Sequence, residues 1–100
     1  MNVQHQGNRL LISGISELNA TNAGAFRDGA RAALNQDTTG ADVDLSETRF
    51  LDSSGLGALI ALHKTVSARG GALRILRPTP TAQQVLELTR LHRILEIVKN

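Results

Sequence analysis

A strand–helix–strand pattern in the middle of the chain limits the folds that this sequence can adopt. Apolar and polar residues alternate in Asp42–Leu45 and again in Leu73–Ile75, as in strands with one covered face. Between them, Ser54–Arg69 has apolar residues at helical spacing and is followed by two glycines, which are typical of a helix end. Strands joined by a helix form right-handed crossovers, so the pattern predicts a parallel sheet in an α/β protein.

Further elements are expected before this unit. Val3–Gln6 and Arg9–Ser13 alternate around a Gly-Asn pair, which predicts a β-hairpin. Thr21 is then predicted to cap a helix over residues 22–34. The hairpin adds an antiparallel edge to the sheet.

The chain after the central unit is predicted to be mainly helical. After a Pro-Thr-Pro break, Thr81 is expected to cap a helix that runs through Thr89, with Val85 and Leu88 facing inward. Residues 94–98 fit either a last helical turn or a short edge strand. The expected order is β-β-α-β-α-β-α, and we expect all residues, 1–100, to form one domain.

The composition limits the classes of function. Apolar residues make up 41% of the chain, which suits a globular protein, and the absence of cysteine excludes disulfides and thiolate chemistry. The N-terminus lacks the features of a signal peptide, and no apolar stretch approaches the roughly 20 residues that cross a bilayer. We therefore expect a soluble cytoplasmic protein without membrane insertion.

The charge gives a weaker indication about partners. The net charge is +2 and the isoelectric point is about 9.9, so arginines could contact an acidic partner or a phosphate backbone. Phe26 and Phe50 are the only aromatic residues, which are too few for a platform that stacks bases. A solvated basic surface is favoured over nucleic-acid binding.

The segment Phe50–Gly57 is the most informative motif. It leaves a strand and enters a helix, a place where functional groups gather in parallel sheets. Ser53 is predicted to be the helix cap, accepting from the amide of Gly55 or Leu56. Two glycines in a first turn cost about 1 kcal/mol each relative to alanine, so we expect them to leave the backbone open to a partner.

The position of Ser53 also suits a charge switch. A helix N-terminus carries about half a positive charge, and a phosphate on Ser53 would bring about −1.5 to −2 charges to it. The fold should tolerate that modification, whereas a docked partner should not. The alternative is that Ser53 acts only as a cap.

Phe50–Gly57 resembles the phosphorylation segment of the anti-sigma factor antagonists, which belong to the STAS domain group. Glu17–Ala23 is similar to the loop before the first helix in that family, and Arg69–Ile75 is similar to its helix-to-strand turn. The pattern of Pro80–Leu95 resembles the carboxyl-terminal part of the family. The resemblance implies one α/β STAS-like domain: a mixed, mostly parallel sheet of four to five strands with an N-terminal β-hairpin, packed with three to four helices.

The resemblance also implies a partner-switching mechanism without enzymatic activity or a cofactor. The unmodified protein would bind an anti-sigma factor serine kinase of the ATPase fold and release the sigma factor. Phosphorylation of Ser53 would end that binding, and a serine phosphatase would restore it. Ser54 is the second choice of acceptor and is expected to be less accessible. The implied partner surface comprises Asn19, Thr21, Asp52, Ser53, Ser54, Gly55, Leu56 and Gly57.

Two features leave room for another role. Asn19 stands where the family usually has an aspartate, which removes a charge from the partner surface. Similar STAS domains also serve as fixed scaffold subunits, for instance of a lipid-transport ATPase or a stress-signalling assembly. The intact Asp52-Ser53 pair favours the switch.

Catalytic and metal sites are disfavoured. His63 follows Ser53 by ten residues on the same predicted helix, about 15 Å away, so it cannot act as its general base. Asp42, Asp44 and Asp52 could suggest a magnesium site, but the first two are expected on a solvated strand face. We expect no metal site and no nucleotide site.

Overall fold

The computed structural model describes residues 1–99. In chain order, its elements are β1 (Asn2–Gln6), β2 (Arg9–Ser13), β3 (Glu17–Leu18), α1 (Ala23–Ala33), β4 (Gly40–Asp44), β5 (Phe50–Leu51), α2 (Ser53–Ala68), β6 (Leu73–Leu76), α3 (Pro80–Leu88), the 3-10 helix η1 (Leu91–Arg93) and β7 (Glu96–Val98).

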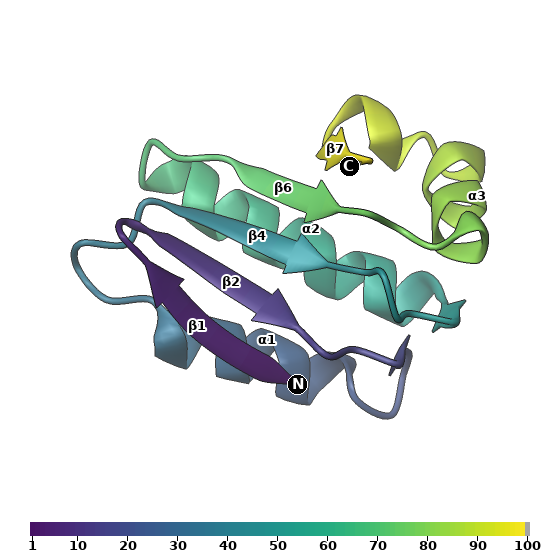
Figure 1. Ribbon diagram of the computed structural model, residues 1–100, viewed down its shortest axis with the longest axis horizontal. Coiled ribbons are helices and arrows are strands. Elements are labelled where there is room, and N and C mark those ends of the chain that lie inside the picture. The colour runs from purple at the N-terminus through teal and green to yellow at the C-terminus, as the bar shows by residue number, and fades with distance from the viewer. Residues whose placement is uncertain (100) are drawn as a thin grey trace.

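The main sheet has five strands in the order β1-β2-β4-β6-β7 (Figure 1). β1 and β2 are antiparallel, and the other neighbours are parallel. The predicted hairpin is confirmed, with Gln6 opposite Arg9 and Gly7 at φ +63° in the turn. The mixed, mostly parallel sheet is confirmed, and residues 96–98 form its edge strand β7.

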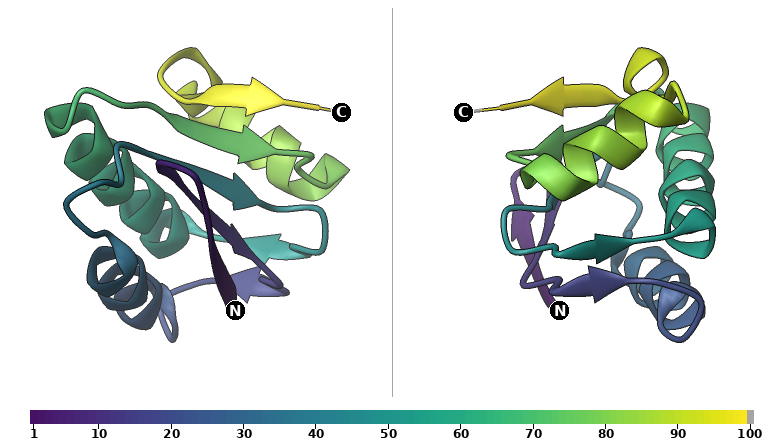
Figure 2. Two further views of the ribbon diagram at one scale, coloured as in Figure 1. Left: turned by 60° about the vertical axis from the view of Figure 1, so that its left-hand side comes forward. Right: turned by 90° about the vertical axis from the view of Figure 1, so that its right-hand side faces the viewer.

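The helices divide between one face and one end of the sheet. α1 and α2 cover one face, and α3 lies beyond the carboxyl ends of the strands (Figures 1 and 2). Apolar side chains of β2, β4 and β6 alternate toward α1 and α2, as period-two strands require. The fully buried core residues of these strands are Leu10, Ile12, Ala41, Val43, Leu73 and Ile75.

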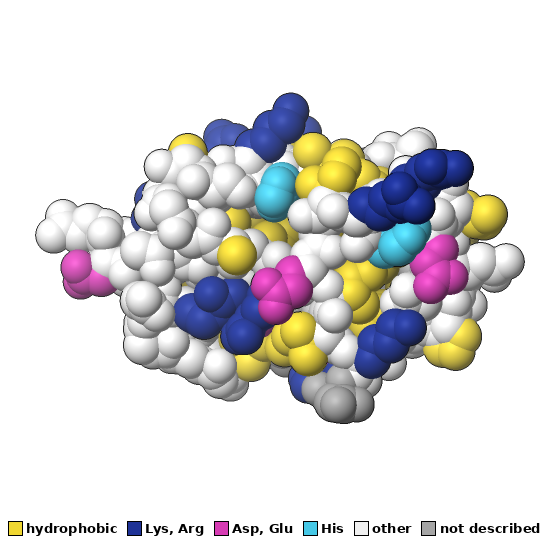
Figure 3. Space-filling view, turned by 90° about the horizontal axis from the view of Figure 1, so that it is seen from above, with side chains coloured by type: hydrophobic (Ala, Val, Ile, Leu, Met, Phe, Trp, Pro, Cys, Tyr) yellow, Lys and Arg dark blue, Asp and Glu magenta, His cyan; other side chains and the backbone are white. Residues whose placement is uncertain are grey.

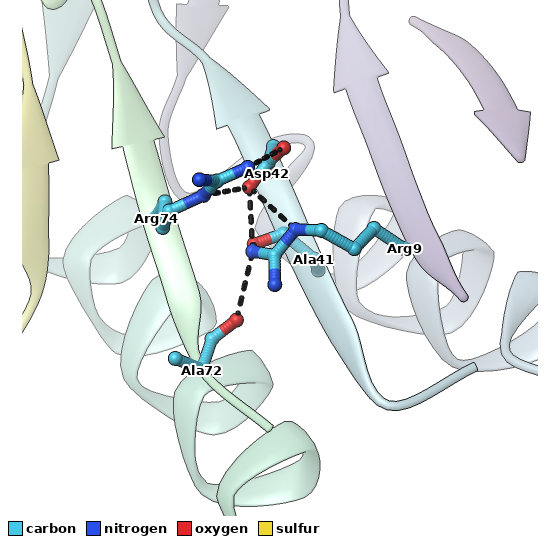
Figure 4. A network of polar contacts seen from close by, with 5 residues as sticks. All are labelled: Arg9, Ala41, Asp42, Ala72 and Arg74. Carbon is cyan, nitrogen blue, oxygen red and sulfur yellow. Dashed lines mark hydrogen bonds and ion pairs between the residues drawn. The ribbon is translucent and has the colours of Figure 1, made fainter. Parts of the chain in front are cut away.

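The other sheet face corrects the expectation that Asp42 is solvated. Asp42 is only 5% exposed, because Arg9 and Arg74 lie over its carboxylate (Figure 4). Arg74 donates to both carboxylate oxygens, at 2.7 and 2.8 Å, and Arg9 donates to Oδ1 at 2.6 Å. Burial raises the pKa of Asp42, but the hydrogen bonds and charges of the two arginines outweigh it, so the pKa lies below its usual value of 3.8.

Two predicted helix starts are wrong by one or two residues. Asn22 occupies the cap position of α1, and not Thr21. Thr79 caps α3, and not Thr81, because its hydroxyl accepts from the amide of Ala82 at 3.1 Å. Pro80 then takes the first helical position, where its missing N–H costs nothing.

The inward face of α3 also differs from the prediction. Leu88 is 76% exposed, whereas Ala82 and Leu86 are fully buried. Val85 is half-buried against the core, as expected. Leu88 follows Leu86 by two residues, about 200° around the helix, so the two side chains cannot both face the core.

Within residues 1–99, no helix is both long and apolar enough to cross a membrane.

Candidate functional site

The site forms where α2 begins, beyond the carboxyl ends of the strands of the main sheet (Figure 1). β5 leads directly into α2 and pairs in parallel with β3, with Leu18 opposite Leu51. This pairing brings the loop after β3, residues 19–22, beside the start of α2. Segments more than 30 residues apart therefore meet at one surface.

Asp52 holds this junction together. Its Oδ1 accepts from the Gly55 amide at 2.9 Å, which makes Asp52 the cap of α2. Its Oδ2 accepts from the Ala20 amide at 3.2 Å, across the junction. The prediction that Ser53 is the cap is therefore wrong: Ser53 is the first residue of α2. An aspartate is as good a cap as a serine, and here it also binds the neighbouring loop.

The loop 19–22 is built by its own asparagines. Asn19 Oδ1 accepts from the Thr21 amide at 3.0 Å, and Asn22 Oδ1 accepts from the Asn19 amide at 2.9 Å. Asn22 also donates from Nδ2 to the carbonyl of Glu17 at 2.8 Å. Such short side-chain bonds to nearby backbone are typical of turns. Asn19 thus shapes the loop that Asp52 binds.

The residues of the predicted partner surface differ in exposure. Thr21, Ser53, Ser54 and Gly57 are exposed, and Asn19 and Asp52 are half-buried. Ser54 is exposed, as Ser53 is, so both serines lie at the surface. The other two members of the set are buried: Gly55 and Leu56.

Gly55 and Gly57 have different roles. A Cβ on Gly55 would lie 2.3 Å from the carbonyl oxygen of Leu18, so only glycine lets α2 approach β3 this closely. The expectation that Gly55 leaves the backbone open to a partner is therefore wrong. A Cβ on Gly57 would meet nothing within 4 Å, so this position does lie open.

Phe50 begins the motif Phe50–Gly57 but was not among the residues of the predicted partner surface. It lies two residues before Asp52 and is 52% exposed. Its neighbour Leu51 is buried, so the alternation of a two-residue strand puts the aromatic ring outside. An exposed aromatic ring three residues before Ser53 in the chain suits a protein–protein contact, because aromatic residues are enriched in interfaces.

The described residues offer little to a metal ion or a base. Residues 1–99 contain no group of three or more His, Asp or Glu side chains that could hold a metal. His63 is half-buried, and its Nδ1 atom is buried without a hydrogen-bond partner among residues 1–99. It follows Ser53 by three helical turns, so it is not placed to take a proton from that hydroxyl.

Replacing Asp52 with alanine should lower the free energy of unfolding by about 1 kcal/mol, because the cap of α2 is lost. Asp52→Asn keeps an acceptor for Gly55 and should lose only part of that energy. Urea denaturation measures both changes, and hydrogen exchange at the Ala20 amide reports the bond across the junction. Unchanged exchange at Ala20 in Asp52→Ala would contradict the role of Asp52 as a link.

Comparison with known proteins agrees with this architecture. The family model described as "Mlab, STAS domain" matches residues 1–98. A protein of Thermotoga maritima described as an anti-sigma factor antagonist is 33% identical over 82 residues, which span 81% of this chain and 73% of that protein.

Solved structures show the same fold. The anti-sigma factor antagonist SpoIIAA in its unphosphorylated form superposes with a TM-score of 0.83 at 21% identity, covering 97% of this chain and 86% of that chain. The phosphorylated form of the Bacillus protein gives a TM-score of 0.75 at 21% identity, covering 97% and 89%. The chain therefore belongs to the STAS domain family, and its relatives include anti-sigma factor antagonists.

Proposed function

We propose that this protein is an anti-sigma factor antagonist whose binding is controlled by phosphorylation of Ser53. In its unmodified form it binds an anti-sigma factor that is also a serine kinase, and the sigma factor is released. The observation that carries the proposal is that Ser53, at the first position of α2 and beside the loop 19–22, is exposed. The relative from Thermotoga and the SpoIIAA structures support it by name and by fold.

The proposed cycle has two chemical steps. The kinase transfers the γ-phosphoryl group of ATP to Ser53 Oγ, which loses its proton as ADP leaves. A serine phosphatase then hydrolyses the phosphoester with water and regenerates the hydroxyl. The antagonist is the substrate of both reactions and catalyses neither.

The electrostatics of the junction explain why the phosphate would end binding. The N-terminus of α2 favours a nearby anion, so the fold accepts the modification. The Asp52 carboxylate lies one residue away and already accepts from Gly55, so it adds like charge at the same surface. A partner covering this surface would have to desolvate a phosphate dianion next to a carboxylate, which is costly.

Variants of Ser53 test the proposal in a binding experiment. Ser53→Ala should bind the kinase and stay bound in ATP, whereas Ser53→Asp should bind at least about tenfold more weakly, a difference of about 1.4 kcal/mol. Ser67→Asp is the matched control, because it adds the same charge to an exposed serine at the other end of α2. Titration calorimetry with the purified kinase measures all three. A gap of threefold or less between Ser53→Ala and Ser53→Asp would overturn the switch.

Mass spectrometry identifies the acceptor. Incubation with the kinase and ATP should modify Ser53, and Ser53→Ala should remain unmodified. Because Ser54 is also exposed, modification of Ser54 alone would move the acceptor by one residue. Copurification of a transporter ATPase, with no kinase and no phosphorylation, would instead support the scaffold role.

A further inference from the structure

A shallow notch lies between α1 and α2 on the side away from the sheet. Its walls are the side chains of α1 and of the middle of α2, and its volume is about 10 Å³, room for one water-sized group. The residues that line it are Arg27, Arg31, Leu34, Ala61, Leu62 and Thr65. A notch this small suits the edge of a macromolecule and not a small molecule, which needs a cavity of several hundred cubic ångströms.

The two arginines at this notch have no partners within the chain. Arg27 and Arg31 are exposed, and neither side chain forms a hydrogen bond or an ion pair with the described residues 1–99. They lie four residues apart on α1, where like charges destabilise a helix. The positive charge of Arg31, in the last turn of α1, interacts favourably with the helix dipole. Arg27 lies in the middle of the helix and does not gain from this interaction. The stability of α1 therefore does not explain the pair.

The charges around the notch are mostly of one sign. Lys64 of α2 is also exposed and forms no ion pair with residues 1–99, whereas Arg69 is engaged with the carbonyls of Asn35 and Thr38. Asp28 is the acidic side chain of α1 and does not bind either arginine. A different surface, over α3 and the β7 edge, shows positive, acidic and apolar groups intermingled (Figure 3).

The notch and the surface around Ser53 are formed by the same two helices. Both helices start at the junction that Asp52 binds, and both carry glycine near their first turn, Gly24 and Gly57. A Cβ at either glycine would meet nothing within 4 Å, so both positions are open. A partner that covers Ser53 can therefore extend along α1 and α2 to Arg27 and Arg31.

We propose that Arg27 and Arg31 bind carboxylates of an acidic segment of the partner protein that docks over Ser53. The aliphatic parts of both arginines and the apolar floor of the notch would contact the same segment. Guanidinium groups suit this role because each can donate two parallel hydrogen bonds to a carboxylate. The inference rests on the proposed function and adds the chemistry of the partner.

The test uses the double variant Arg27→Glu/Arg31→Glu and the purified kinase. The double variant should bind at least about tenfold more weakly than the wild type, and Arg93→Glu, in η1, should bind like the wild type. Raising the salt concentration from about 0.05 to 0.5 M should weaken wild-type binding, because salt screens the charges of Arg27 and Arg31. The affinity of Arg27→Gln/Arg31→Gln, which lacks these charges, should depend less on salt. Circular dichroism checks that α1 is retained. Wild-type affinity in the double variant would overturn the inference.

The outcomes separate this inference from the proposed function. If Ser53→Asp abolishes binding and the arginine variants do not, the proposed switch stands and the inference of an acidic partner segment is wrong. A glutamate-rich peptide of about 15 residues gives a readout that needs no kinase. It should shift the NMR signals of Ala61 and Thr65, which line the notch, in the wild type and not in the double variant. Equal shifts at Arg93, or none at the notch, would also overturn the inference.

Discussion

Replacing Gly55 with alanine is expected to lower the free energy of unfolding by about 2 kcal/mol, although alanine is the better helix former. The new Cβ would lie 2.3 Å from the carbonyl oxygen of Leu18 and 2.9 Å from Cδ1 of Leu51. The oxygen belongs to the backbone of β3, so it cannot turn away as a side chain could. Overpacking of about 3 kcal/mol therefore exceeds the helix-propensity gain of about 1 kcal/mol.

Gly57→Ala is the matched control for this prediction. It lies half a turn further along the same helix, its Cβ would meet nothing, and it should raise the free energy of unfolding by up to about 1 kcal/mol. For a domain of this size, the melting temperatures of the two variants should differ by roughly 12–24 °C. Equal melting temperatures would show that α2 can move away from β3 without cost.

Replacing Asp42 with asparagine is the second change with a large expected effect. It removes the charge between Arg9 and Arg74 and should lower the free energy of unfolding at pH 7 by about 2 kcal/mol. The loss should be smaller than the 3–5 kcal/mol typical of a fully buried pair, because both arginines reach water, with 27% and 37% of their side chains exposed. Urea denaturation measures the difference.

The same variant predicts a pH dependence. The pKa of Asp42 in the fold lies below 3.8, so its contribution is fully present above about pH 5 and is lost as the pH falls through the folded-state pKa. The stability curves of wild type and Asp42→Asn should therefore converge as the pH falls from above 3.8 through the lowered folded-state pKa of Asp42. Asp44 also has a lowered pKa, but it is present in both proteins, as is Glu96 opposite Arg74. Asp28→Asn, at an exposed position without an ion pair to residues 1–99, is the control and should leave the free energy of unfolding at pH 7 close to that of the wild type.

The strands and helices of the main fold were predictable because their periodicity is local. The alternation at Asp42–Leu45 and the helical spacing after Ser53 each depend on a few neighbouring residues. The helix starts were less predictable, since two neighbouring residues can both act as caps. Backbone angles then decide between Asp52 and Ser53, or between Thr79 and Thr81.

The details of the site depend on contacts between residues that are far apart in the sequence. β3 and β5 have two residues each, too few for a visible alternation, yet their pairing brings Ala20 to Asp52. Arg9 and Arg74 each lie more than 30 residues from Asp42 in the chain, so their ion pairs leave no local pattern. The resemblance to a known family identified the segment around Ser53 as a candidate site. The close packing of Gly55 against Leu18 could be recognised only in the structure.

The capping of α2 by Asp52 has a consequence for genetics at the neighbouring position. Because residue 53 contributes no side-chain bond to the helix start, alanine, aspartate or threonine there should leave the melting temperature nearly unchanged. Any phenotype of such alleles then reports recognition by other proteins and not the abundance of folded chain. Codon 53 can therefore be saturated with substitutions in cells, and growth or reporter output read directly as a measure of signalling.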